Sequence, residues 1–149
     1  MFKVISDTAC DLSKEYTDSN NIGLVPLYVT FDGEKYYKEQ IDITDDEFYR
    51  QMIEEGSYPK SSLPTIQDFI DAFMPSVTAG VPIICICIST LFSGSYNSAT
   101  NARDQILEDY PDAKITIFNS MQNSSSMALF VHEAERMSKD NVDYDDAVR

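Results

Sequence analysis

The residues best suited to chemistry in this sequence follow a run of apolar residues. Val81–Ile88 contains no charged or hydroxyl side chain and predicts a strand that is buried on both faces. Ser89, Thr90, Ser93 and Ser95 come after it, where a helical pattern begins. In an open parallel sheet, ligands bind beyond the carboxyl ends of the strands, and a helix that starts there offers free backbone N–H groups. Hydroxyls and amides of this kind favour binding a small anion or a carboxylate over bond cleavage.

Simpler interpretations stay open from the residues alone. Ser93 can cap the following helix without binding any ligand. Asp7, at the end of the predicted first strand, can orient hydroxyls at the same edge of the sheet or cap the next turn. His132 is the only histidine, and its place in a predicted helix without triad partners indicates a surface residue. The five glycines form neither a dinucleotide-binding fingerprint nor a P-loop.

The composition narrows the class of protein. The 149 residues are enough for one domain with its own core. With 11 basic and 25 acidic residues the net charge is −14, which disfavours nucleic acid and anionic membrane surfaces. We find no signal peptide and no apolar stretch of the ~20 residues that a membrane span needs. Cys10, Cys85 and Cys87 predict reduced core thiols, and we expect a cytoplasmic protein.

Alternating strand and helix signals predict an α/β fold, with a mostly parallel sheet flanked by helices on both faces. Asp11 is the expected cap of the first helix, and Thr44 with Glu47 predicts a capping box. Pro26 is expected at a bulge or an unpaired position, and residues 57–64 as a loop. Strands are expected at 2–6, 23–31, 81–88 and 113–118, with a short return strand at 36–37; helices are expected at 12–19 and 125–138, after Thr44, Thr65 and Ser93, and from 143.

Four segments carry motifs that can be compared with a known family: Ile5–Asp11, Val25–Val29 with Phe48–Tyr49, Pro59–Thr65 and Ile88–Ala99. They resemble, in order, motifs of the DegV family of bacterial fatty-acid-binding proteins. The first is similar to the family's opening D-S-T-A-D motif, and the second to its second-strand motif and following helix. The third is similar to its T-S-Q-P-S loop, and the fourth to its S-S-x-L-S-G-T-Y-x-S-A signature. The resemblance spans essentially the whole chain.

The resemblance implies a two-lobed protein with a long-chain fatty acid between the lobes, of which residues 1–149 are the first lobe and the second is absent. It implies a binding protein rather than an enzyme, with the fatty acid as ligand and with no metal or other cofactor. The implied partner is a fatty-acid kinase, to which the carboxylate is presented for phospholipid synthesis. Carried over by motif, the carboxylate-holding residues are Ser61, Ser62, Ser89, Thr90, Ser93 and Gly94, and the residues implied in presentation are Asp7 and Thr8.

The sequence also departs from the family's pattern. Ser61 and Ser95 replace threonine, Leu63 replaces glutamine, and Asn119 stands where the family has an acidic residue. Two other functions remain as alternatives: a hydrolase or transferase with Ser93 or Ser61 as nucleophile, and an interaction module whose crevice holds nothing. The enzyme alternative lacks a good base, because neither motif contains histidine. Without a second lobe, we expect poor fatty-acid binding and self-association through the crevice face.

Overall fold

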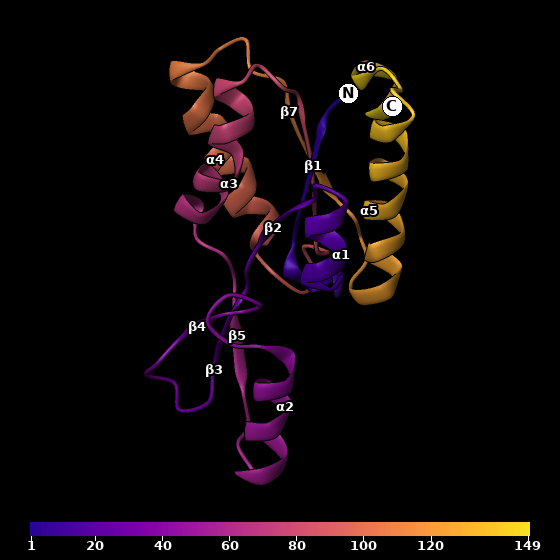
Figure 1. The fold of residues 1–149 in the computed structure, drawn as a ribbon. Coiled ribbons are helices and arrows are strands. Elements are labelled where there is room, and N and C mark those ends of the chain that lie inside the picture. Colours follow the sequence, from indigo (N-terminus) through magenta and orange to yellow (C-terminus); the bar gives the residue numbers. More distant parts are fainter.

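The computed structural model describes all 149 residues, and its larger sheet is parallel. The strand order is β2–β1–β6–β7 (Figure 1). Ile5 of β1 pairs with Gly23 on one side and with Cys85 on the other. This sheet confirms the predicted α/β class. Its strands are β1 (Lys3–Asp7), β2 (Gly23–Val25), β6 (Ile83–Cys87) and β7 (Ile115–Asn119).

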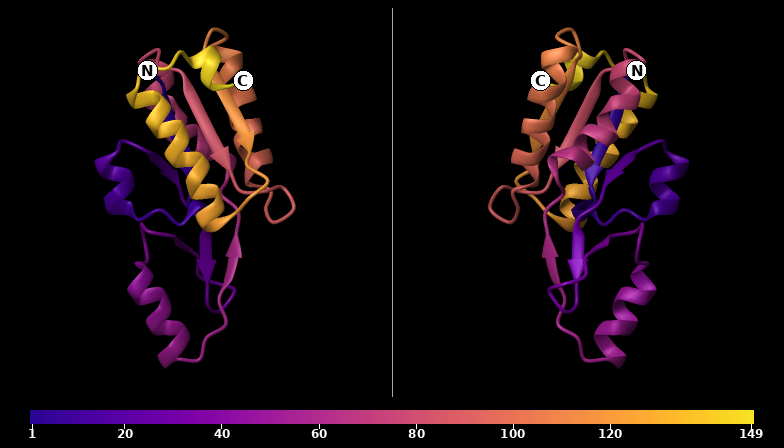
Figure 2. Two further views of the ribbon diagram at one scale, coloured as in Figure 1. Left: turned by 90° about the vertical axis from the view of Figure 1, so that its right-hand side faces the viewer. Right: turned by 90° about the vertical axis from the view of Figure 1, so that its left-hand side faces the viewer.

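Helices cover both faces of the parallel sheet (Figures 1 and 2). Ile83 and Cys85 of β6 belong to a core shared with α3 and α4, whereas Ile84 and Ile86 belong to a core shared with α5. The central strand is therefore buried on both faces, as its apolar sequence predicts. One face carries α3 (Ile66–Thr78) and α4 (Ser95–Asp109); the other carries the 3₁₀ turn η1 (Thr8–Cys10), α1 (Lys14–Ser19), α5 (Ser124–Lys139) and α6 (Tyr144–Ala147).

A smaller antiparallel sheet projects from the carboxyl ends of the parallel strands (Figure 1). Its strand order is β4–β3–β5, and one helix, α2, accompanies it. The ring of Phe48 on α2 lies 5.6 Å from that of Phe31, which follows β3. We call residues 27–63 the small subdomain. Its elements are β3 (Tyr28–Thr30), β4 (Tyr37–Lys38), α2 (Asp45–Glu54) and β5 (Lys60–Ser62).

Two strand predictions were wrong. Residues 23–31 form two strands in different sheets rather than one, because Pro26 lacks the amide hydrogen that would continue the ladder. The loop predicted at 57–64 contains β5, which pairs with β3. Both differences have the same consequence: the chain leaves the parallel sheet after β2, builds the small subdomain and returns through β5 to α3.

The helix caps match the predictions only in part. The first helix is capped by Ser13, whose hydroxyl accepts a hydrogen bond from the Tyr16 amide at 3.2 Å. Asp11, the predicted cap, instead ends the preceding 3₁₀ turn with a left-handed φ of 54°. Thr44 accepts from the Glu47 amide at 3.3 Å, but the reciprocal half of that capping box is missing because the Glu47 carboxylate binds Arg50.

The strands β1 and β6 meet where the winding direction of the sheet reverses. The chain passes from β1 to β2 on one side and from β6 to β7 on the other. Asp7 ends β1, and Ile88 follows the last residue of β6. These two residues therefore lie at the edge where open parallel sheets bind their ligands.

Candidate functional site

The β6–α4 loop (Ile88–Gly94) carries most of the predicted site residues. The Ser89 carbonyl accepts hydrogen bonds from the Phe92 and Ser93 amides at 2.9 and 3.2 Å. The Ser89 amide donates to the Gln122 carbonyl at 2.9 Å, and its hydroxyl accepts from the Leu91 amide at 3.2 Å. Ser89 is buried, and these hydrogen bonds shape the loop.

The same loop leaves several donors available to a ligand. Ser93 Oγ accepts from the Ser95 amide at 3.2 Å and donates no hydrogen bond within the chain. Gly94 is the N-cap residue of α4, one position later than predicted, and the amides of Gly94 and Tyr96 donate no hydrogen bond within the chain. Thr90 is exposed, and its hydroxyl accepts from Asn119 Nδ2 at 3.0 Å. Free hydroxyl and amide hydrogens at a helix N-terminus can bind a carboxylate.

The small subdomain brings the second predicted segment to this loop. The side chain of Leu63 lies 3.5 Å from where a Cβ atom of Gly94 would stand, so the two segments are in contact. Ser61 is exposed, and its hydroxyl forms no hydrogen bond within the chain. Because side chains alternate along a strand, Ser61 and Ser62 point to opposite faces of the small sheet. Only one of these two serines can therefore direct its side chain towards the β6–α4 loop.

Asp7 fastens both ends of the β6–α4 loop to β1. Its Oδ2 atom accepts from the Ile88 amide at 3.0 Å and from the Ser95 hydroxyl at 2.6 Å. Its side chain is fully buried, and Oδ1 has no hydrogen-bond partner. Burial raises the pKa of Asp7, and the Ser95 hydroxyl and the amides of Ile88 and Ala9 oppose that shift. Asp7 therefore acts on the site through the loop and does not reach the surface.

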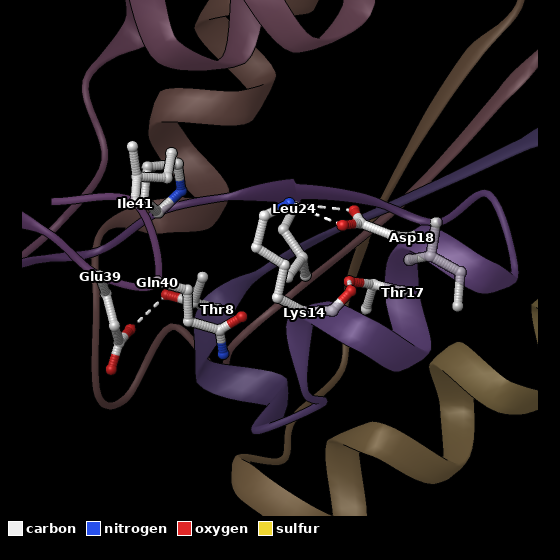
Figure 3. A pocket seen from close by; sticks show the side chains of 10 residues that line it. Thr8, Lys14, Thr17, Asp18, Leu24, Glu39, Gln40 and Ile41 are labelled. Carbon is white, nitrogen blue, oxygen red and sulfur yellow. Dashed lines mark hydrogen bonds and ion pairs between the residues drawn. The ribbon is translucent and has the colours of Figure 1, made fainter. Parts of the chain in front are cut away.

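Thr8 joins the parallel sheet to the small subdomain. Its hydroxyl donates to the Glu39 carboxylate and accepts from the Leu27 amide at 3.0 Å. Burial raises the pKa of Glu39, and the Thr8 hydroxyl opposes the shift. Thr8, Glu39 and Gln40 line a polar pocket of about 100 Å³ beside α1 (Figure 3). Ser61 is exposed and Ser93 is half-buried, and neither lines this pocket.

The single histidine of the chain lies away from this loop. His132, on α5, has its Nδ1 atom 2.7 Å from the hydroxyl of Tyr16. No group of three or more His, Cys, Asp or Glu side chains is arranged to hold a metal ion. None of the helices is long and apolar enough to cross a membrane.

No binding or positioning role was predicted for Asn119 or Asp68, which bond residues of the candidate segments. Asn119 orients Thr90, because Oδ1 accepts from the Thr90 amide at 3.3 Å while Nδ2 donates to its hydroxyl. Asp68 bonds side chains of the small subdomain, Lys38 and Tyr28. Asn119 could have been found from its place at the carboxyl end of a predicted strand. The bonds of Asp68 to Lys38 and Tyr28 have no comparable signal, because these partners are 30 and 40 residues away in the sequence.

A parallel α/β fold with hydroxyls and free amides at its switch point defines a class of small-ligand-binding domains. Comparison with known proteins identifies a family within this class. The sequence pattern of the family described as "Uncharacterised protein, DegV family" matches residues 1–149. A DegV domain-containing protein of Clostridium acetobutylicum is 37% identical over 138 residues, which are 93% of this chain and 47% of that protein. The chain belongs to the DegV family.

Two solved structures share this fold. A protein described as a fat acid (stearic acid)-binding protein from Eubacterium ventriosum is 47% identical, with a TM-score of 0.94 over 99% of this chain and 51% of that one. The Fatty Acid Kinase (Fak) B3 protein of Streptococcus pneumoniae, loaded with linoleic acid, has a TM-score of 0.81 at 23% identity, over 99% of this chain and 52% of that one. The chain spans about half the length of the curated relatives it matches.

Proposed function

We propose that this chain binds the carboxylate end of a long-chain fatty acid at the β6–α4 loop. The hydroxyls of Ser93, Ser61 and Thr90 donate to the carboxylate, together with the free amide of Gly94. Ser89 shapes the loop from inside, and Ser62 places the Ser61 strand. The observation that carries the proposal is the stearic acid-binding protein of E. ventriosum, 47% identical over 99% of this chain.

We further propose that the bound carboxylate is presented to a fatty-acid kinase that feeds phospholipid synthesis. The Fak B3 neighbour of S. pneumoniae supports this step by its fold and name. Asp7 and Thr8 are both buried, so their contribution to presentation passes through the groups that they hold. Asp7 holds the β6–α4 loop, and Thr8 holds Glu39 of the small subdomain.

Nuclear magnetic resonance with decanoate, a soluble fatty acid, tests the carboxylate site. We expect decanoate to shift the amide resonances of Gly94 and Tyr96 before those of α2. Ser93→Ala and Ser61→Ala each remove a hydrogen bond to a charged group, which contributes ~1.5–3 kcal/mol. Each substitution should therefore weaken binding roughly tenfold to a hundredfold.

Ser125→Ala is the matched control, because Ser125 is exposed on α5 and its hydroxyl forms no hydrogen bond within the chain. Its affinity should equal that of the parent. Affinities of Ser93→Ala and Ser61→Ala within twofold of the parent would remove these hydroxyls from the site. Absence of any decanoate-dependent shift at millimolar concentration would reject fatty-acid binding by this chain.

A further inference from the structure

The residues proposed to hold the carboxylate lie on two parts of the molecule. Ser93 belongs to the β6–α4 loop of the parallel sheet, whereas Ser61 belongs to β5 of the small subdomain. Figure 2 shows the small subdomain as a separate layer beyond the ends of the parallel strands. Close packing between its helix or strands and the elements of the larger part is sparse. The spacing of Ser61 and Ser93 therefore depends on a few side-chain bonds between the two parts.

Asp68, in the first turn of α3, makes the most extensive of these bonds. Its Oδ1 atom accepts from Lys38 Nζ of β4 at 2.7 Å, and its Oδ2 atom accepts from the Tyr28 hydroxyl of β3 at 2.8 Å. Oδ2 also accepts from the amide and the hydroxyl of Thr65, at 2.9 and 2.6 Å. The Asp68 side chain is only 7% exposed. One carboxylate thus caps its own helix and holds two strands of the other sheet.

The two strands that Asp68 binds belong to the same sheet as β5, the strand that carries Ser61. Lys38 pairs with Tyr28 across β4 and β3, and Tyr28 pairs with Ser62 across β3 and β5. Paired residues project from the same face of a sheet, so Lys38, Tyr28 and Ser62 form one row across the small sheet. Asp68 binds the first two members of this row. The third member is the neighbour of Ser61 in β5.

We propose that Asp68 is a positioning residue, which fixes the small sheet on α3 and so sets the placement of Ser61 relative to Ser93. Thr8 and Glu39 form a second tie between the two parts. That tie lies at the end of β4, one residue beyond the row, whereas Asp68 acts on the row itself. The binding consequence of this proposal rests on the proposed function, but the structural consequence does not.

Lys38→Met and Tyr28→Phe test the proposal without touching the capping box of Thr65 and Asp68. The readout is the distance distribution between spin labels on Cys substituted for Ile53 of α2 and for Asp104 of α4, both exposed. The native cysteines are buried and stay unlabelled. We expect Lys38→Met and Asp68→Asn to broaden the distribution and Lys38→Arg to keep it narrow. Asp71→Asn is the control, because Asp71 is exposed on the same helix and binds only Gln67.

Binding supplies the second readout. Lys38→Met should weaken decanoate binding about fivefold, because a displaced Ser61 would lose part of its hydrogen bond to the carboxylate. In the Lys38→Met protein, Ser61→Ala should reduce the affinity for decanoate by a smaller factor than it does in the parent. The factor for Ser93→Ala should be the same in both proteins. If Lys38→Met only disturbed the structure, without moving Ser61, it would lower the affinity losses caused by Ser61→Ala and Ser93→Ala equally.

Unchanged distance distributions in folded Lys38→Met and folded Tyr28→Phe would overturn the proposal, even if Asp68→Asn fails to fold. Equal costs of Ser61→Ala in the parent and in Lys38→Met would also overturn it. A parent protein that binds no decanoate would reject the proposed function alone, since the distance measurement would still decide whether Asp68 orients the small sheet.

Discussion

Asp7 lies at the carboxyl end of β1 and accepts hydrogen bonds from Ile88, the first residue of the loop that carries Ser93, and from Ser95, the residue after that loop. Burial raises the pKa of this carboxyl group. A folded chain then keeps the proton over a pH range in which the unfolded chain has released it. Stability falls as the pH rises through that range, which starts near the ordinary pKa of about 3.9.

Asp7→Asn removes this titration and keeps an oxygen that can accept a hydrogen bond. We expect the free energy of unfolding of the parent, measured relative to Asp7→Asn, to decrease as the pH rises from about 4. Urea unfolding between pH 3.5 and 7 measures it. Ser95→Ala removes a bond that favours the ionised carboxyl, so the decrease should extend to higher pH. A difference between parent and Asp7→Asn that does not change with pH would contradict the burial of an ionisable Asp7.

The candidate site could be predicted in part from single residues. The hydroxyls of Ser93 and Thr90 follow an apolar strand, and that local pattern is sufficient to place them at the edge of the sheet. The bonds from Asp7 to Ser95 and from Asp68 to Lys38 join residues 88 and 30 positions apart. Nothing in the local sequence encodes such pairs, because they arise only when distant segments of the chain are packed together.

The first turns of α2 and α3 show that other side chains can compete with the backbone for the acidic residue of a capping box. Thr65 and Asp68 complete a capping box, with both reciprocal hydrogen bonds present. Thr44 forms only one half, because Arg50 and Gln51 engage the Glu47 carboxylate. The same sequence signature therefore predicts both helices, but it does not predict which box closes.

Thr65→Ala should lower the free energy of unfolding by about 1–2 kcal/mol, since it removes the cap of a helix that contributes Phe69 and Phe73 to the core. Thr44→Ala should cost about 0.5 kcal/mol, because it loses a single bond on a helix without buried residues. Urea unfolding of the two variants and the parent measures both. Equal losses, or a larger loss for Thr44→Ala, would show that the closed box adds nothing.

The strands were predictable where burial dictates their sequence. Ile83–Cys87 is apolar on both faces, and β1 and β7 show related patterns. β5 has no such signature, because its three residues, Lys60–Ser62, form an edge strand of a small sheet with little core beneath it. Its conformation comes from pairing with β3, which is tertiary information.

The molecule as a whole combines strong acidity with an apolar surface at the β6–α4 loop. The net charge is −14. Leu91 and Phe92 are 83% and 67% exposed, and Leu63, which lies against Gly94 of the same loop, is 43% exposed. Like charges keep copies of the chain apart in dilute salt, whereas the apolar side chains favour contact once the charge is screened.

We therefore expect concentration-dependent dimerisation through this surface at about 1 M salt, where the Debye length is about 3 Å. Sedimentation velocity of the parent and of the double variant Leu91→Ser and Phe92→Ser measures it. The double variant should stay monomeric. Ile53→Ser, which removes an exposed apolar side chain on α2, should dimerise like the parent. Dimers that persist in the double variant would place the contact elsewhere.

The small subdomain also has an evolutionary consequence. It enters the fold after Pro26 and leaves it before Pro64, both buried. Since Tyr28 pairs with Ser62, the two ends of the insert lie side by side. An insert with neighbouring ends can be exchanged as a block by recombination between relatives. Such a chimaera would take its β5 hydroxyls from one parent and its β6–α4 loop from the other, so the two halves of the carboxylate site can evolve as separate modules.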